Sequence, residues 1–213
     1  MSRLPERHRR EEIINCVTHG AGLLASIAGA IALVGMAWAS QNPLQVPSVV
    51  IYCASLILVY LSSTLYHAAS HPPTKSRLQV FDHCAIYVLI AGTYTPLVLL
   101  TLVGSTRWIM FSVVWTMAIA GVVFKYFFTG RMKYLSMATY MTMSFVAIFA
   151  ARPLLASLPP TTTTLVLAGG ASYVLGACVF LSHRPYAHSV WHLFVMGGST
   201  CHFFAIVARI GMP

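Results

Sequence analysis

Long apolar runs, separated by short polar or proline-containing breaks, dominate the pattern of this sequence. A helix that crosses a bilayer needs about 20 mostly apolar residues, and each run reaches that length. The pattern predicts an all-α integral membrane protein, a bundle of seven transmembrane helices. The runs cover residues 14–38, 46–69, 79–103, 107–129, 133–152, 163–182 and 187–210.

The domain organisation follows from how little sequence lies outside these runs. We expect a short basic segment over residues 1–13 and a single seven-helix membrane domain over residues 14–213. Hydrophobic residues make up 58% of the chain and charged residues only 8%, whereas soluble domains carry about 25% charged residues. With a mean hydropathy of +0.76, the chain lacks the polar residues needed to cover a water-facing surface.

The basic residues predict how the bundle is oriented. The chain has 13 Lys and Arg residues against 4 Asp and Glu residues, and cytoplasmic loops hold the excess of positive charge. Ten basic residues fall on the side of the N-terminus and three on the other, so we expect a cytoplasmic N-terminus and an external C-terminus. Because these residues lie mostly between apolar runs, we interpret them as topology signals and expect no nucleic acid partner. The ten are Arg3, Arg7, Arg9, Arg10, Lys75, Arg77, Lys125, Arg131, Lys133 and Arg184, and the three are Arg107, Arg152 and Arg209.

Four ionisable side chains are expected in one layer near the cytoplasmic side. His67 lies near the end of the second run, and Asp82 lies just inside the third. At about 1.5 Å per residue, both are roughly one helical turn from the boundary. His188 and His192 begin the seventh run from the same side, and their i, i+4 spacing places both rings on one helix face.

Three histidines and a water molecule are a familiar zinc ligand set, and the metal lowers the pKa of that water to about 7. Asp82, the only acid within a predicted transmembrane core, could hold the water or transfer its proton. For any single histidine the alternative is a helix-end residue that binds loop carbonyls or lipid headgroups. The matched depth of the set favours a zinc site.

The first run brings further polar residues to the same half of the membrane. Glu12, Asn15 and His19 are candidates for partners that fix the tautomers of the ligand imidazoles. A polar helix entrance near the headgroups explains them equally well. His83 points about 100° away from Asp82 and His202 lies about 15 Å beyond His192, so neither is expected at the metal.

Several short motifs occur in order along the chain. They are Glu11-Glu12-Ile13-Ile14-Asn15, Thr18-His19-Gly20, Ser63 with His67, Phe81-Asp82-His83, and His188 with His192. Together these motifs resemble the bacterial hemolysin III branch of the progestin and adiponectin receptor family, and the resemblance covers essentially the whole chain. It implies a seven-helix bundle with zinc held by His67, His188 and His192, with Asp82 near the zinc-bound water and Ser63 beside the site.

The resemblance also implies candidate functions. Ceramide hydrolysis by adiponectin-receptor relatives suggests zinc-dependent hydrolysis of a lipid amide or ester, with membrane lipids as partners and a bacterial inner membrane as the location. The alternative is a non-enzymatic sensor of the membrane or a cytolytic protein, in either case with structural zinc. The chain lacks the sizeable N-terminal region of the receptors, so no protein hormone is expected as a partner.

Overall fold

A computed structural model describes residues 6–129, 131–182 and 184–211 of the chain. Throughout these ranges the regular structure is helical. The elements are α1 (Glu6–Trp38), α2 (Gln45–Ala68), α3 (Pro72–Thr101), α4 (Gly104–Phe128), α5 (Lys133–Ser144), the 3₁₀ helix η1 (Phe145–Ala150), α6 (Ala151–Ser157), α7 (Pro160–Leu181) and α8 (Ala187–Ile210).

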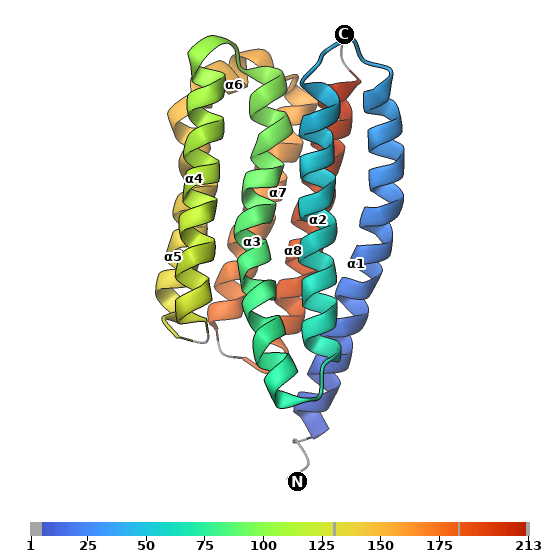
Figure 1. Ribbon diagram of the computed structural model, residues 1–213, viewed down its shortest axis with the longest axis vertical. Helices are drawn as coiled ribbons and strands as arrows, with labels where there is room; N and C mark the ends of the chain where they lie inside the picture. Colours follow the sequence, from blue (N-terminus) through green and yellow to red (C-terminus); the bar gives the residue numbers. More distant parts are fainter. Residues whose placement is uncertain (1–5, 130, 183, 212–213) are drawn as a thin grey trace.

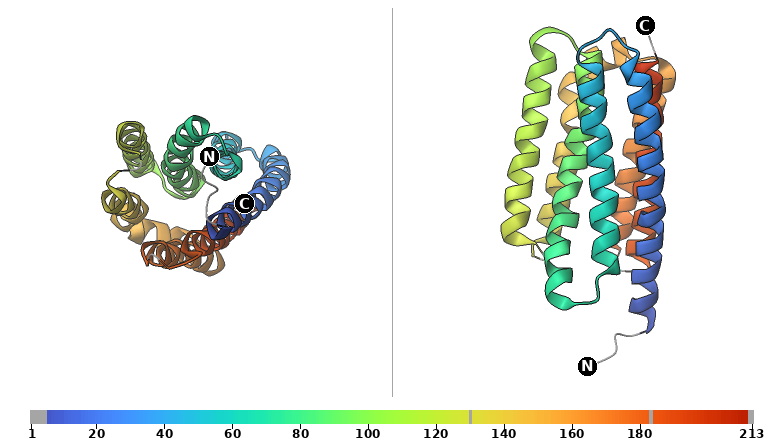
Figure 2. Two further views of the ribbon diagram at one scale, coloured as in Figure 1. Left: turned by 90° about the horizontal axis from the view of Figure 1, so that it is seen from below. Right: turned by 45° about the vertical axis from the view of Figure 1, so that its right-hand side comes forward.

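These elements form seven spans that are long and apolar enough to cross a membrane. Six are single helices, and the fifth, Tyr134–Ser157, combines α5, η1 and α6. The spans run up and down along one axis, and the two ends of the chain lie at opposite ends of the bundle (Figure 1). Seen along that axis, the helices are arranged in a ring (Figure 2). The predicted fold class, a seven-helix membrane bundle, is confirmed.

Two helices begin about two turns earlier than their apolar runs. The first begins at Glu6 and the third at Pro72, rather than at the predicted 14 and 79. Helical hydrogen bonding does not require apolar side chains, so a span can continue for two turns beyond the hydrocarbon into polar surroundings. The proline suits a first turn, where its missing N–H is not needed. Of the predicted basic segment 1–13, residues 6–13 therefore belong to α1, and residues 1–5 lie outside the described residues.

The fifth span is interrupted in its middle. Pro153 cannot donate a backbone hydrogen bond to the preceding turn, and the chain winds as a 3₁₀ helix just before it. The Tyr94 hydroxyl of α3 spans the junction, donating to the Ser144 carbonyl at 2.5 Å and accepting from the Ala147 N–H at 3.0 Å. A neighbouring helix thus satisfies backbone groups that the irregular segment leaves free, as a membrane interior requires.

The apolar side chains divide between lipid and core. On α1, Val17, Leu24 and Ile31 are seven residues apart and 65%, 71% and 74% exposed, which is a stripe suited to hydrocarbon. One buried cluster joins α1, α2, α3 and α8, and a second joins α3, α4, the fifth span and α7. Because α3 contributes to both clusters, it connects the two halves of the bundle.

Candidate metal centre

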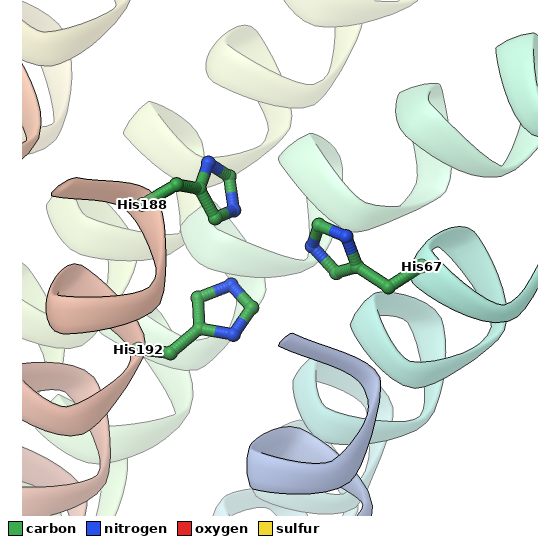
Figure 3. Close-up of side chains that lie close together, drawn as sticks. All are labelled: His67, His188 and His192. Carbon is green, nitrogen blue, oxygen red and sulfur yellow. The ribbon is translucent and has the colours of Figure 1, made fainter. Parts of the chain in front are cut away.

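Three histidine rings converge at the end of the bundle that carries the N-terminus (Figure 3). His67 comes from the last turn of α2, and His188 and His192 come from the first turns of α8. One nitrogen of each ring lies within 4.8 Å of those of the other two. The ring centroids are 4.7 to 5.1 Å apart. The structure therefore brings together the three histidines that the sequence indicated as ligands.

A carboxylate fixes the orientation of the His67 ring. The Nδ1 atom of His67 lies 3.1 Å from Oε2 of Glu12, and a carboxylate can only accept, so Nδ1 carries the proton. The other ring nitrogen, Nε2, is buried and has no hydrogen-bond partner. Lys75 holds the same carboxylate oxygen at 2.6 Å and also donates to the Tyr66 carbonyl at 3.0 Å. The bare lone pair of Nε2 faces the other two histidines.

The His192 ring is oriented by α1 in a similar way. Its Nδ1 lies 3.5 Å from the Thr18 hydroxyl, and that hydroxyl already donates to the Ile14 carbonyl at 2.8 Å. The hydroxyl must therefore accept from His192, which leaves Nε2 of His192 as a lone pair. One residue after His188, Ser189 donates to Oδ1 of Asn15 at 2.6 Å.

The start of α8 is also anchored to α1. Oε1 of Glu11 accepts from the backbone N–H of Tyr186 at 3.1 Å. Tyr186 precedes α8 with a φ of 59°, in the left-handed region that non-glycine residues seldom adopt. Since two turns of α1 contact the histidine-bearing ends of both α2 and α8, the polar N-terminal part of α1 positions the three histidines. The sequence pattern indicated no role at the site for Thr18, Lys75 or Ser189; their positions close to candidate residues were the available signal.

His19 lies against the site without a hydrogen bond. Its ring stacks on His192 with centroids 3.5 Å apart and an angle of 9° between the planes, and it contacts Tyr60 edge-on. Both of its ring nitrogens are buried and unpartnered. Glu12 and Asn15 thus bind the histidine-bearing elements by hydrogen bonds, whereas His19 supports His192 by stacking.

Asp82 and Ser63 lie beside the three histidines, not among them. Both are buried, and the Asp82 carboxyl interacts with the His67 ring and the Ser63 hydroxyl. The hydroxyl makes no hydrogen bond of good geometry. The tight group of ligand atoms found among the described residues contains His67, His188 and His192 without Asp82. Asp82 therefore lies next to His67 and outside the three-histidine group.

The site opens into a cavity of about 890 Å³ that extends far along the bundle. His19, Ser63, Asp82, His188 and His192 line one end. Apolar side chains of α3, the fifth span and α7 line most of the remainder. Among them, Ile148, Leu155 and Leu167 of the fifth span and α7 are also largely exposed, so this wall of the cavity is thin. Such a cavity suits an acyl chain that enters from the bilayer.

The residues present fit a zinc ion. Zinc takes imidazole nitrogens at about 2.0 to 2.1 Å, which in a tetrahedral site sets them roughly 3.3 Å apart, so modest ring rotations would close the present spacing. The unpartnered buried Nε2 of His67 and the carboxylate on its other nitrogen match the arrangement typical of metal-bound histidine. His202 lies elsewhere, with Nε2 3.2 Å from the Val166 carbonyl.

Together, the spans and the site define a class: a multi-pass membrane protein with a three-histidine group at one end of its bundle. The chain belongs to the family described as "Haemolysin-III related", which it matches over residues 7–203. The family resemblance noted in the sequence motifs is thereby confirmed.

Individual relatives cover nearly the whole chain. It is 42% identical over 199 residues to Hemolysin-3 of Bacillus cereus, covering 93% of this chain and 91% of that protein. It is 41% identical to the Hemolysin-3 homolog of Bacillus subtilis (strain 168), covering 93% of each. It is 30% identical over 206 residues to the human monocyte to macrophage differentiation factor, covering 92% of this chain and 83% of that protein.

Proposed function

We propose that this protein is a zinc-dependent hydrolase that cleaves an amide or ester of a membrane lipid within the bilayer. The observation that carries the proposal is the position of the three histidines at the end of an acyl-sized cavity, with Nε2 of His67 buried and unpartnered. A structural metal site is usually closed by four protein ligands, whereas three histidines leave a position for water or substrate.

In this proposal each residue has a separate task. His67, His188 and His192 would hold the zinc ion, which would polarise the scissile carbonyl and supply a water-derived nucleophile near neutral pH. Asp82 accepts and returns the proton, because among the described residues it is the one acid that faces this part of the cavity. Ser63 donates a hydrogen bond to Asp82 or to the substrate. The apolar walls hold the acyl chain.

The excess of basic residues at the site's end of the bundle supports an orientation with the N-terminus and the zinc on the cytoplasmic side. The bacterial relatives support the plasma membrane of the cell as the location.

Metal analysis tests the first part. Purified protein should contain equimolar zinc, and His188→Ala should lose most of it while remaining helical by circular dichroism. Wild-type protein that copurifies with no zinc, and takes up none on addition, would end the proposal of a zinc site.

Lipid turnover tests the second part. Purified protein in mixed micelles should release fatty acid from a lipid amide or ester, and Asp82→Asn should lose that activity while keeping its zinc. Ser76→Ala, on the exposed start of the same helix, is the control and should keep both. Zinc-loaded wild type without turnover of any amide or ester lipid tested would contradict a hydrolase.

A second candidate is a non-enzymatic protein with structural zinc. The observation that favours it is that the histidines join α2 to α8 while α1 binds both, so the metal would lock three helices together. Two relatives carry the name Hemolysin-3, which points to cytolysis. In this case, removing zinc would unfold the bundle, and no lipid would be hydrolysed before or after.

A further inference from the structure

A second polar group lies in the same cavity, on α4. Lys125 is in the last helical turn of α4, its side chain is only 3% exposed, and it lines the cavity together with Arg131. Lysines near a membrane boundary normally extend their ammonium groups to the headgroups or water. This lysine instead points inward, where a charge without a partner is costly.

The described residues place no counter-charge beside Lys125. The chain contains four carboxylic side chains. Glu6 pairs with Arg10, Glu11 binds the N–H of Tyr186, and Glu12 binds Lys75 and His67. Asp82 interacts with His67 and Ser63. Among the described residues, no carboxylate lies within 4 Å of the Lys125 ammonium, and nothing there accepts a hydrogen bond from it.

The neighbours of Lys125 on α3 do not neutralise it either. His83 interacts electrostatically with Lys125, and its Nδ1 is buried without a partner. Cys84 donates its thiol proton to the Val122 carbonyl at 3.7 Å and so is not a thiolate. Arg131 adds a second positive charge at the same end of the cavity. Within the described part of the chain, Asp82 is the one acid that lines the cavity, and it interacts with His67 and Ser63, so Lys125 and Arg131 face the cavity without a paired carboxylate.

From this arrangement we infer that the cavity binds an anionic amphiphile, with its acyl chain along the apolar walls and its carboxylate or phosphate against Lys125. A buried ammonium binds such a group with a charge-assisted hydrogen bond, stronger than one between neutral groups. The inference deepens the proposed function by naming the charge of the lipid. The inference shares with the proposed function only the assumption that a lipid occupies the cavity. It requires neither bound zinc nor turnover of the lipid.

A binding measurement tests the inference with a reporter that the chain already contains. Trp191 lines the cavity, so a brominated acyl chain bound there quenches its fluorescence. The ligands are a brominated fatty acid, its uncharged methyl ester and a brominated lysophosphatidic acid, titrated into detergent-solubilised full-length protein. Trp191→Phe identifies the fraction of the quenching that comes from the cavity.

We expect wild type to bind the fatty acid at least about tenfold more tightly than its methyl ester, since only the carboxylate brings a negative charge to the ammonium, whereas the ester carbonyl accepts a weaker hydrogen bond. Lys125→Met should abolish this preference, and Lys125→Arg should keep it. Arg77→Gln, which removes an exposed charge from the same end of the bundle, is the matched control. Tighter binding of lysophosphatidic acid than of the fatty acid would identify a phosphate headgroup as the natural anion, and competition by inorganic phosphate would identify a free anion.

Equal affinity of wild type for the fatty acid and its methyl ester would overturn the inference, even if Lys125→Met failed to fold. Zinc content measured on the same samples separates this result from the proposed function. Charge preference without zinc would contradict the hydrolase alone, and zinc without charge preference would contradict the anion site alone.

Discussion

Replacing Glu12 by glutamine removes the negative charge between His67 and Lys75 and keeps the length of the side chain. If Glu12 orients His67 for a metal, the glutamine variant should bind zinc about 10- to 100-fold more weakly, the usual effect of losing such a partner. That loss corresponds to roughly 1.4 to 2.8 kcal/mol of zinc-binding free energy.

The same substitution should change the stability of the zinc-free protein far less. The side chains of Glu12 and Lys75 are 18% and 25% exposed, so their ion pair borders on water. Exposed pairs typically contribute up to about 1 kcal/mol to the free energy of unfolding. We therefore expect a large effect on metal affinity with a small effect on the melting temperature of the metal-free form.

The assay is competition for zinc against a chromophoric chelator, at fixed pH and in one detergent. Glu6→Gln is the control, because Glu6 pairs with Arg10 on the exposed start of the same helix and touches no histidine. Glu12→Gln with a wild-type dissociation constant for zinc would refute the positioning role. An equal loss in both variants would attribute the effect to net charge alone.

Three further predictions concern packing, the interrupted span and the metal. Gly92→Ala should lower the melting temperature, because an added Cβ would lie 2.0 Å from the hydroxyl of Ser55 in α2. Gly35→Ala is the control, since nothing lies within 4 Å of its added Cβ, and equal melting temperatures of the two variants would contradict the close contact of α2 and α3. Tyr94→Phe should speed hydrogen exchange over residues 144–147, since both of its bonds to that backbone are lost; unchanged exchange would show that the hydroxyl does not stabilise the junction. Removal of zinc by a chelator should lower the melting temperature of wild type but not of His192→Ala, because a ligand stabilises only the protein that binds it. A similar drop in both proteins would indicate an effect of the chelator unrelated to the site.

The sequence predicted the spans well because bilayer thickness imposes one length on all of them. It placed the starts of α1 and α3 too late, since polarity marks the edge of the hydrocarbon and not the end of the helix. The fifth run was expected as one span, and its 3₁₀ interruption depends on Tyr94, a residue of another helix. Local composition near Pro153 indicates where a break can occur but does not identify what stabilises it.

The candidate site likewise has features that the sequence predicts and features that only the packing of the helices sets. The i, i+4 spacing of His188 and His192 is a property of one helix and is visible in the sequence. The contact of His67 with these two histidines depends on α2 and α8 lying close together. The equal depth of the three histidines in the membrane suggested this neighbourhood, but depth alone does not determine which helices are neighbours. The chain therefore determined by itself a membrane bundle with histidines in one layer, because hydrophobic length and helical periodicity are local. The tertiary structure alone decided the roles of Thr18 and Lys75 and the inward direction of Lys125, because each depends on which face of one helix packs against another.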